Sequence, residues 1–320
     1  MQAVQFNEYG DRDVLAVTEV PRPEPERRGV VVAVESAAIN PVDTYFRTGS
    51  YEPASLPWIP GSDLAGVVEA VGEDVESFAV GDRVFGTALG KDEPGTCAEY
   101  VAVPEDKLAH LPGSVSYEAG AALALVGVTA WQSLIDACGL QPADTALVHG
   151  GSGGVGHVAI QLAAATGARV TTTASTGYHD RLRQLGADDV FDYRRDDLEA
   201  AIVDAGSPDV ILDHRLDEYL AFDAEVAAHG GDVAAIGNES PSATFEDVPR
   251  CRGKALSVHH VSMFNTPDIS AVLDRLGRLA ADDELSPVIA RRYTLDNVDE
   301  AHRAVLEDSY LGKLVVDVTG

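Results

Sequence analysis

The chain has 320 residues, of which 45% are hydrophobic, and its 52 acidic and 23 basic side chains give a formal net charge of −29. A chain of this length is too long for one compact hydrophobic core, so we expect two domains. Its hydrophobic fraction is sufficient to form a core in each. We exclude nucleic acid and anionic membranes as expected partners, because so negative a surface repels phosphate groups.

The acidic residues are spread along the whole chain and do not form one tail. Such a composition resembles that of proteins from salt-loving organisms, in which high ionic strength screens the repulsion among carboxylates. We expect a halophilic protein that loses stability on desalting. An acidic protein from an organism of ordinary salinity is the alternative.

The three cysteines, Cys97, Cys138 and Cys251, are widely separated and lack partners at metal-ligand spacing. They indicate neither a disulfide framework nor a zinc cluster. The chain opens without a charged and apolar leader, and we find no apolar run of about 18 residues. We therefore expect a soluble protein of the reducing cytoplasm.

The N-terminal part of the chain is rich in predicted strands. Alternating or β-branched runs bounded by Gly, Pro and Asp predict strands at residues 30–34, 66–71, 83–86 and 98–103. Helical periodicity is scarce there. We expect a small, partly closed and mostly antiparallel β-domain.

From about residue 117 the pattern changes to helices near 118–130 and 131–138, followed by strands and helices in alternation. This alternation predicts right-handed crossovers and a parallel, doubly wound sheet, so the fold class is α/β. An amphipathic helix at 269–279 precedes a final strand at 314–318, which we expect to rejoin the first domain. The predicted strands of the parallel sheet are 145–148, 169–174, 189–191, 210–212, 233–236 and 257–261.

The strongest motif lies at residues 148–156, between a predicted strand and a predicted helix. Gly151, Gly153 and Gly156 have the dinucleotide-binding spacing, which allows a tight turn, backbone approach to a diphosphate, and close helix–strand packing. The helix start offers N–H groups and a positive dipole end to the anion. A glycine turn without ligand is the alternative. The expected diphosphate contacts are Gly151, Ser152, Gly153, Gly154, Val155 and Gly156.

The end of the second strand of the parallel sheet predicts which nicotinamide cofactor is bound. An acidic side chain about 20 residues after the glycine turn would bind the ribose hydroxyls of NAD, and residues 174–177 contain none. Ser175 leaves room for a 2′-phosphate, and His179 and Tyr193 follow it with hydrogen-bonding groups, as do Arg181 and Arg183. We expect NADPH. If the arginines are solvated and Ser175 only ends a strand, the preference for NADPH would be weak.

Several motifs, in order along nearly the whole chain, resemble a zinc-free quinone oxidoreductase of the medium-chain dehydrogenase/reductase superfamily. They lie at residues 40–51, 60–66, 81–84, 150–156, 301–302 and 312–316. The resemblance implies a Rossmann NADPH-binding domain at residues 119–265. It also implies a GroES-like, mostly antiparallel β catalytic domain at 1–118 and 266–320.

Zinc-dependent members of that superfamily have a cysteine where this chain has Asn40, and a His-Glu pair where it has Ser62 and Asp63. A tetrahedral zinc site needs converging thiolate or imidazole ligands. His259 and His260 are adjacent in a predicted strand and therefore point to opposite faces. We expect no catalytic metal.

The resemblance implies hydride transfer from NADPH to a quinone or similar electron-poor acceptor. It places Asn40, Tyr45 and Tyr51 beside the nicotinamide or its substrate, with Tyr51 as the first choice for proton donor or oxyanion stabiliser. Loop anchoring and the bracing of turns are the alternatives. The resemblance further implies cofactor contacts at Thr129, Gly237, Asn238 and Lys313.

The chain departs from the family pattern at two places. His179 stands where these reductases commonly have a lysine for the 2′-phosphate, and a histidine titrates near neutral pH, so we expect pH-sensitive phosphate binding. His214 and Arg215 replace smaller residues after the fourth strand of the parallel sheet, where ligands bind in such sheets. A variable surface loop is the alternative there.

Two other functions stay open. One is reduction of an enone or enoyl double bond by NADPH, and the other is a cofactor-binding protein with a structural or sensing role and little turnover. By analogy with the family we expect a homodimer, with the predicted edge strand at 257–261 pairing across a two-fold axis.

Overall fold

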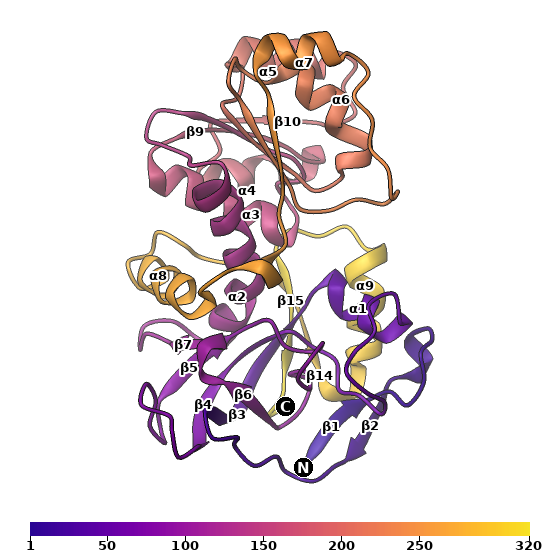
Figure 1. Cartoon of the computed structure of the whole chain (residues 1–320), viewed down its shortest axis with the longest axis vertical. Helices are drawn as coiled ribbons and strands as arrows, with labels where there is room; N and C mark the ends of the chain where they lie inside the picture. Colours follow the sequence, from indigo (N-terminus) through magenta and orange to yellow (C-terminus); the bar gives the residue numbers. More distant parts are fainter. The chain divides into compact units, whose positions relative to one another are not determined.

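The computed structural model describes residues 1–320, which form two compact units. Unit 1 contains Met1–Val128 and Pro267–Gly320, and unit 2 contains Thr129–Thr266. The N-terminal and C-terminal parts of the chain, indigo and yellow in Figure 1, therefore belong to the same unit. Unit 2 is inserted between them in the sequence.

Unit 1 is built on a seven-stranded sheet with the order β14-β15-β3-β4-β5-β7, in which β6 also pairs with β3. All of its pairings are antiparallel except that of β14 with β15. A separate pair, β1 and β2, is antiparallel. The strands are β1 Gln2–Gln5, β2 Ala16–Glu19, β3 Gly29–Ile39, β4 Asp63–Val71, β5 Arg83–Gly86, β6 Tyr100–Pro104, β7 Leu108–His110, β14 Ile289–Thr294 and β15 Lys313–Asp317.

The last strand, β15, pairs with β3, as we expected from the sequence. Apolar residues of β3, β4 and β15 form the core of unit 1, with Val32, Leu64 and Leu314 fully buried. The α-helices of this unit are α1 Pro41–Thr48, α8 Ile269–Ala281 and α9 Val298–Glu307, together with most of α2 Tyr117–Trp131. Short 3₁₀ turns lie at Arg12–Val14, Glu105–Lys107 and Leu295–Asn297.

Unit 2 is a six-stranded parallel sheet with the order β10-β9-β8-β11-β12-β13. This is the doubly wound order of a dinucleotide-binding domain, in which the strand order reverses between β8 and β11. The predicted fold class is confirmed. The strands are β8 Thr145–Val148, β9 Arg169–Thr173, β10 Asp189–Phe191, β11 Val210–Asp213, β12 Asp232–Ala235 and β13 Ser257–His260.

Helices connect these strands, and α5 packs against α6. Leu147, Ile202, Ile211 and Val233 are fully buried in one core of the unit. The helices are α3 Gly154–Thr166, α4 His179–Gln184, α5 Leu198–Ala205, α6 Leu216–Val226 and α7 Val248–Lys254, with 3₁₀ turns at Thr176–Tyr178 and Met263–Asn265.

The chain passes from unit 1 to unit 2 inside α2. Where the sequence indicated two helices, α2 runs without a break into a π-helical segment, Gln132–Ala137. The resulting 21-residue helix, Tyr117–Ala137, is long and apolar enough to cross a membrane by length and composition. Its most apolar window is 72% buried within the structure, as in the core helix of a soluble protein.

Candidate functional site

Unit 1 contains a buried polar network at the ends of three neighbouring strands. Asn40 directly follows β3, Asp63 begins β4, and Lys313 begins β15. Because β3 pairs with both β4 and β15, this register brings the three side chains together. Each is at most 3% exposed.

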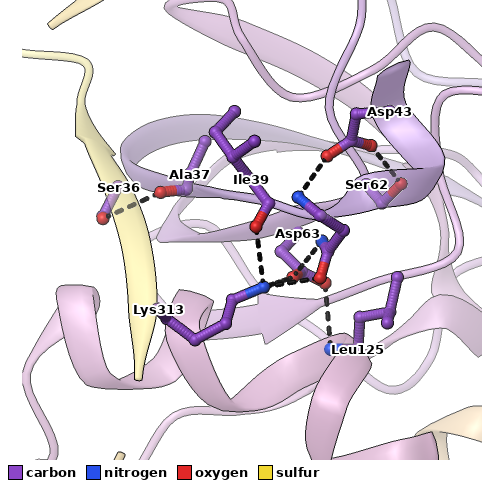
Figure 2. Close-up of polar contacts among 9 residues, drawn as sticks. Ser36, Ala37, Ile39, Asp43, Ser62, Asp63, Leu125 and Lys313 are labelled. Atoms are coloured by element: carbon purple, nitrogen blue, oxygen red, sulfur yellow. Dashed lines mark hydrogen bonds and ion pairs between the residues drawn. The ribbon is translucent and has the colours of Figure 1, made fainter. Parts of the chain in front are cut away.

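The ammonium group of Lys313 is the centre of this network (Figure 2). It donates to the Ile39 carbonyl at 3.0 Å and to Asn40 Oδ1 at 2.5 Å, and it lies 3.5 Å from Asp63 Oδ2. Asn40 Nδ2 donates to Asp63 Oδ2 at 2.8 Å, and the Leu125 N–H donates to Asp63 Oδ1 at 2.9 Å. The amide of Asn40 is therefore already engaged on both of its polar atoms.

A second buried carboxylate, Asp43, braces the start of α1. Its Oδ2 accepts from the Asn40 N–H at 2.7 Å, and its Oδ1 accepts from Ser62 Oγ at 2.6 Å. Burial raises the pKa of Asp43 to about 7. Burial also raises the pKa of Asp63 and lowers that of Lys313, while the attraction between Lys313 and the two carboxylates opposes both shifts.

The residues at the zinc-ligand positions do not fit zinc. Asn40, Ser62 and Asp63 supply amide, hydroxyl and carboxylate oxygens, and an ammonium group already lies against two of them. No group of three or more His, Cys, Asp or Glu side chains in the chain is arranged to hold a metal ion. A zinc ion at this place would lack thiolate and imidazole ligands and would be repelled by Lys313.

Two tyrosines beside this network are accessible. Tyr45 lies on α1 and is 39% exposed, and Tyr51 follows α1 and is 54% exposed. Their rings meet edge to face at 5.5 Å, and the Tyr51 N–H donates to the Tyr45 carbonyl. Gly49 makes this return possible by taking the left-handed conformation (φ 76°) at the end of α1.

In unit 2, the glycine-rich segment connects β8 to α3. At two of its glycines the neighbouring atoms leave no room for a side chain. A Cβ on Gly151 would lie 2.1 Å from Thr172 Oγ1, and one on Gly156 would lie 2.3 Å from the Gly150 carbonyl oxygen. The left-handed turn itself is at Gly150 (φ 65°), one residue before the position that the spacing indicated. Helix α3 begins at Gly154 with Gly153 as its N-cap, so the N–H groups of Gly154 and Val155 lie in its open first turn.

The predicted 2′-phosphate residues follow β9, except Tyr193, which follows β10. Ser175 is the N-cap of the turn at Thr176–Tyr178, and His179 Nε2 lies 3.1 Å from the Ala174 carbonyl oxygen. Tyr193 is 46% exposed, with the guanidinium of Arg194 5.2 Å from its ring centre. The sequence analysis did not include Arg194 among the cofactor-binding candidates. Its guanidinium lies near the Tyr193 ring because of the local backbone conformation, and it is paired with Asp192.

The other arginines named from the sequence form local pairs, Arg181 with Gln184 and Arg183 with Asp180. Thr129 lies on α2 and is buried. Asn238 Nδ2 donates to the Ser240 carbonyl at 3.0 Å.

His214 lies between the glycine turn and Gly237. A Cβ on Gly150 would lie 2.8 Å from its ring, and one on Gly237 would lie 2.5 Å from its carbonyl oxygen. Arg215 forms ion pairs with Glu218 and Glu239, each at 2.7 Å. The second departure from the family pattern, His214 and Arg215, therefore lies at the carboxyl ends of β8, β11 and β12, where such sheets bind ligands.

Comparison with known proteins agrees with this arrangement. Residues 26–113 match the alcohol dehydrogenase GroES-like domain, and residues 185–316 match the zinc-binding dehydrogenase domain. The chain is 34% identical to a quinone oxidoreductase of Lama guanicoe, over 99% of this chain and 97% of that protein. It belongs to the quinone oxidoreductase family of the medium-chain dehydrogenase/reductase superfamily.

Solved structures of this superfamily share the complete fold. A crystal structure of an NAD-dependent alcohol dehydrogenase has a TM-score of 0.91 and 32% identity, over 99% of this chain and 100% of that one. The Escherichia coli quinone oxidoreductase complexed with NADPH has a TM-score of 0.89 and 26% identity, with the same coverage. The solved structures that resemble this member of the quinone oxidoreductase family therefore include one described as NAD-dependent and one complexed with NADPH.

Replacing Gly156 by alanine tests the glycine turn. The added Cβ would push against the Gly150 carbonyl, and a displacement of this kind costs ~1–3 kcal/mol. We expect NADPH binding, measured by isothermal titration calorimetry, to weaken by about tenfold or more. Gly253→Ala on α7 is the matched control, because a Cβ there meets open space. Equal affinities for the two variants would contradict this role.

Replacing Lys313 by methionine tests the buried network. Asp63 would lose its cation, and breaking a buried pair costs ~3–5 kcal/mol. We expect urea denaturation to show this loss in free energy of unfolding, and we expect Lys313→Met combined with Asp63→Asn to recover part of it. A double variant no more stable than the single variant would show that the pairing with Asp63 is unimportant.

Proposed function

We propose that this chain is an NADPH-dependent oxidoreductase that reduces a quinone or a similar electron-poor acceptor without a catalytic metal. The observation that carries the proposal is the glycine turn, whose packing excludes a side chain at Gly151 and Gly156. The similarity to quinone oxidoreductases over the length of the chain supports the reaction type.

The residues present fit a dinucleotide phosphate. The first turn of α3 presents N–H groups at a positive dipole end, which binds a diphosphate locally despite a net charge of −29. No carboxylate occupies residues 174–177 after β9, so nothing there repels a 2′-phosphate or binds the ribose hydroxyls of NAD. The expected contacts at this end are Ser175, His179 and Tyr193. The NADPH complex of the Escherichia coli relative supports the same choice.

When bound, NADPH supplies a hydride. The chain's own residues then have to position the acceptor and stabilise the oxyanion that forms. Tyr51 is the best placed for this in unit 1, because its side chain is exposed and its backbone is held against α1. Tyr45 supports it through the ring contact.

Other predicted residues take supporting roles in this proposal. Asn40 and Lys313 hold the start of α1 from within the buried network, so both act on the site by positioning. Thr129, Gly237 and Asn238 remain proposed contacts of the cofactor on unit 2.

We also propose that unit 1 acts as the catalytic domain and unit 2 binds NADPH; the boundary that we expected after residue 118 lies after Val128 in the structure. Metal independence is supported by the donor set around Asn40 and by the ammonium of Lys313 that lies within it. The free cysteines Cys97, Cys138 and Cys251 support a reducing, cytoplasmic location.

The proposed reaction is tested by following NADPH oxidation against a panel of quinones and enones, before and after dialysis against EDTA. We expect turnover with quinones, preference for NADPH over NADH, and no effect of the chelator. Turnover restricted to enones would move the function to double-bond reduction. Binding of NADPH without turnover would favour a structural or sensing role, and a requirement for zinc would contradict the proposal.

In the same assay, Tyr51→Phe should lower kcat by about a hundredfold if the phenol stabilises the oxyanion, with little change in NADPH affinity. Tyr100→Phe is a suitable control, because Tyr100 lies on β6 with the Arg22 guanidinium over its ring, a contact that phenylalanine keeps. An unchanged kcat in Tyr51→Phe would remove Tyr51 from the mechanism.

We further propose that the chain is a halophilic homodimer, with β13 pairing at the edge of the six-stranded sheet. Its carboxylates repel one another unless salt screens them. We expect the melting temperature to fall between molar and millimolar salt, and light scattering in molar salt to give twice the chain mass. An unchanged melting temperature would contradict halophilic adaptation, and a monomeric mass would contradict the dimer.

A further inference from the structure

A buried chain of hydrogen bonds lies directly beneath the glycine turn of unit 2. His149, between β8 and Gly150, is 2% exposed and its ring stacks on Tyr219 with centroids 4.5 Å apart and planes at 3°. Its Nε2 lies 2.9 Å from Oδ1 of Asp223, which is fully buried on α6. These two residues are 74 positions apart in the sequence.

The Gly150 N–H donates to Thr173 Oγ1 at 3.3 Å, and the threonine hydroxyl can donate to His149 Nδ1, which lies 3.4 Å away. In this arrangement His149 Nε2 carries the ring proton and donates it to Asp223 Oδ1, since an ionised carboxylate oxygen only accepts. Burial lowers the pKa of His149 to about 4, so the ring is neutral at neutral pH.

The lower end of the chain is a pair of carboxyl groups. Asp213, fully buried at the end of β11, accepts from the Arg215 N–H at 2.6 Å through Oδ1, and its carboxyl group lies close enough to that of Asp223 for the two to interact. Oδ2 of each residue is buried and meets no N–H or O–H donor of the protein. Two adjacent buried carboxylates would repel each other, and one proton held between them gives each oxygen a partner.

The groups around the pair do not neutralise a second negative charge. His149 and His214 are both neutral, because burial lowers the pKa of each to about 4. Tyr219 lies over His149, with Tyr193 near it, and the guanidinium of Arg215 is directed to Glu218 and Glu239. Burial raises the pKa of Asp213 to about 7 and that of Asp223 to about 8, so the pair still holds a proton at neutral pH.

We propose that Asp213 and Asp223 share one proton and act as positioning residues, which hold the glycine turn through His149 and Thr173 in the shape that receives the cofactor's diphosphate. The link to the diphosphate rests on the proposed NADPH binding, whereas the shared proton does not. Loss of that proton puts a second negative charge beneath the turn. It both disturbs the hydrogen-bond chain and repels the diphosphate.

The direction of the pH dependence follows from the two carboxyl groups. Their pKa values in the folded protein are raised above the ordinary value of a carboxyl group, so the folded state binds the proton more tightly than the unfolded state. The stability that protonation of the pair contributes is complete below the ordinary carboxyl pKa, and it is lost as pH rises through the raised pKa values of about 7 and about 8.

Asp223→Asn is the decisive variant, because asparagine can keep both bonds without a titrating proton. Its Oδ1 can accept from His149, and its amide can donate toward Asp213. The infrared difference spectrum of the cofactor-free proteins at neutral pH, unmodified protein minus Asp223→Asn, should show the carbonyl stretch of a protonated carboxylic acid. The carboxyl group of Asp43, whose pKa burial also raises to about 7, is common to both proteins and cancels in the difference. We expect the difference band to disappear at alkaline pH.

NADPH affinity supplies the second measurement. Between about pH 6 and about pH 9, we expect the Kd of the unmodified protein to rise by about tenfold, and that of Asp223→Asn to change by less than about twofold. Asp204→Asn, which removes one exposed carboxylate from α5 of the same unit, should behave like the unmodified protein. Should Asp223→Asn fail to fold, Asp213→Asn makes the same test from the other side of the pair.

Absence of this difference band between the unmodified protein and a folded Asp223→Asn variant would overturn the shared proton. An equal pH dependence of Kd in Asp223→Asn and the unmodified protein would overturn the coupling to the glycine turn. Failure of the unmodified protein to bind NADPH at any pH would instead refute the proposed function and leave the infrared result standing.

Discussion

A buried charged side chain needs an opposite charge or hydrogen bonds from the surrounding protein, and the buried polar groups of both units are arranged to meet this requirement. In unit 1 the ammonium of Lys313 is held by Asn40, Asp63 and the Ile39 carbonyl, so the last strand of the chain is tied to the first long strand by more than its backbone pairing. The same cation lies where a metal-dependent relative would need metal ligands. The contacts of Lys313 thus connect β15 to β3 and β4. They also place a positive charge among side chains that would otherwise face a zinc ion.

Unit 2 meets the same constraint without a cation. Asp213 and Asp223 are buried beside neutral His149, and Arg215 is engaged with Glu218 and Glu239. A proton takes the place that Lys313 has in unit 1. The difference matters for function because a proton held by two carboxyl groups is lost as pH rises, whereas the ammonium of Lys313 belongs to the side chain that Asn40 and Asp63 hold in place.

Much of the fold was predictable because it depends on local patterns. Short apolar runs separated by helical periodicity located all six strands of the parallel sheet, and the glycine spacing located the turn before α3. The π-helical continuation of α2 was not predictable, since nothing in residues 131–138 separates one continuous helix from two. Gly150 takes the left-handed conformation, whereas Gly151 is needed because Thr172 of the neighbouring strand occupies the space that its Cβ would take.

The sequence by itself determined the α/β class and the glycine-rich turn between β8 and α3, because each depends on residues close together in the chain. The tertiary structure alone decided which polar side chains meet. Asn40 and Lys313 are 273 positions apart, and His149 and Asp223 are 74 apart. Their contacts follow from strand order and register, which no local pattern contains, so their roles in positioning emerge only when the sheets form.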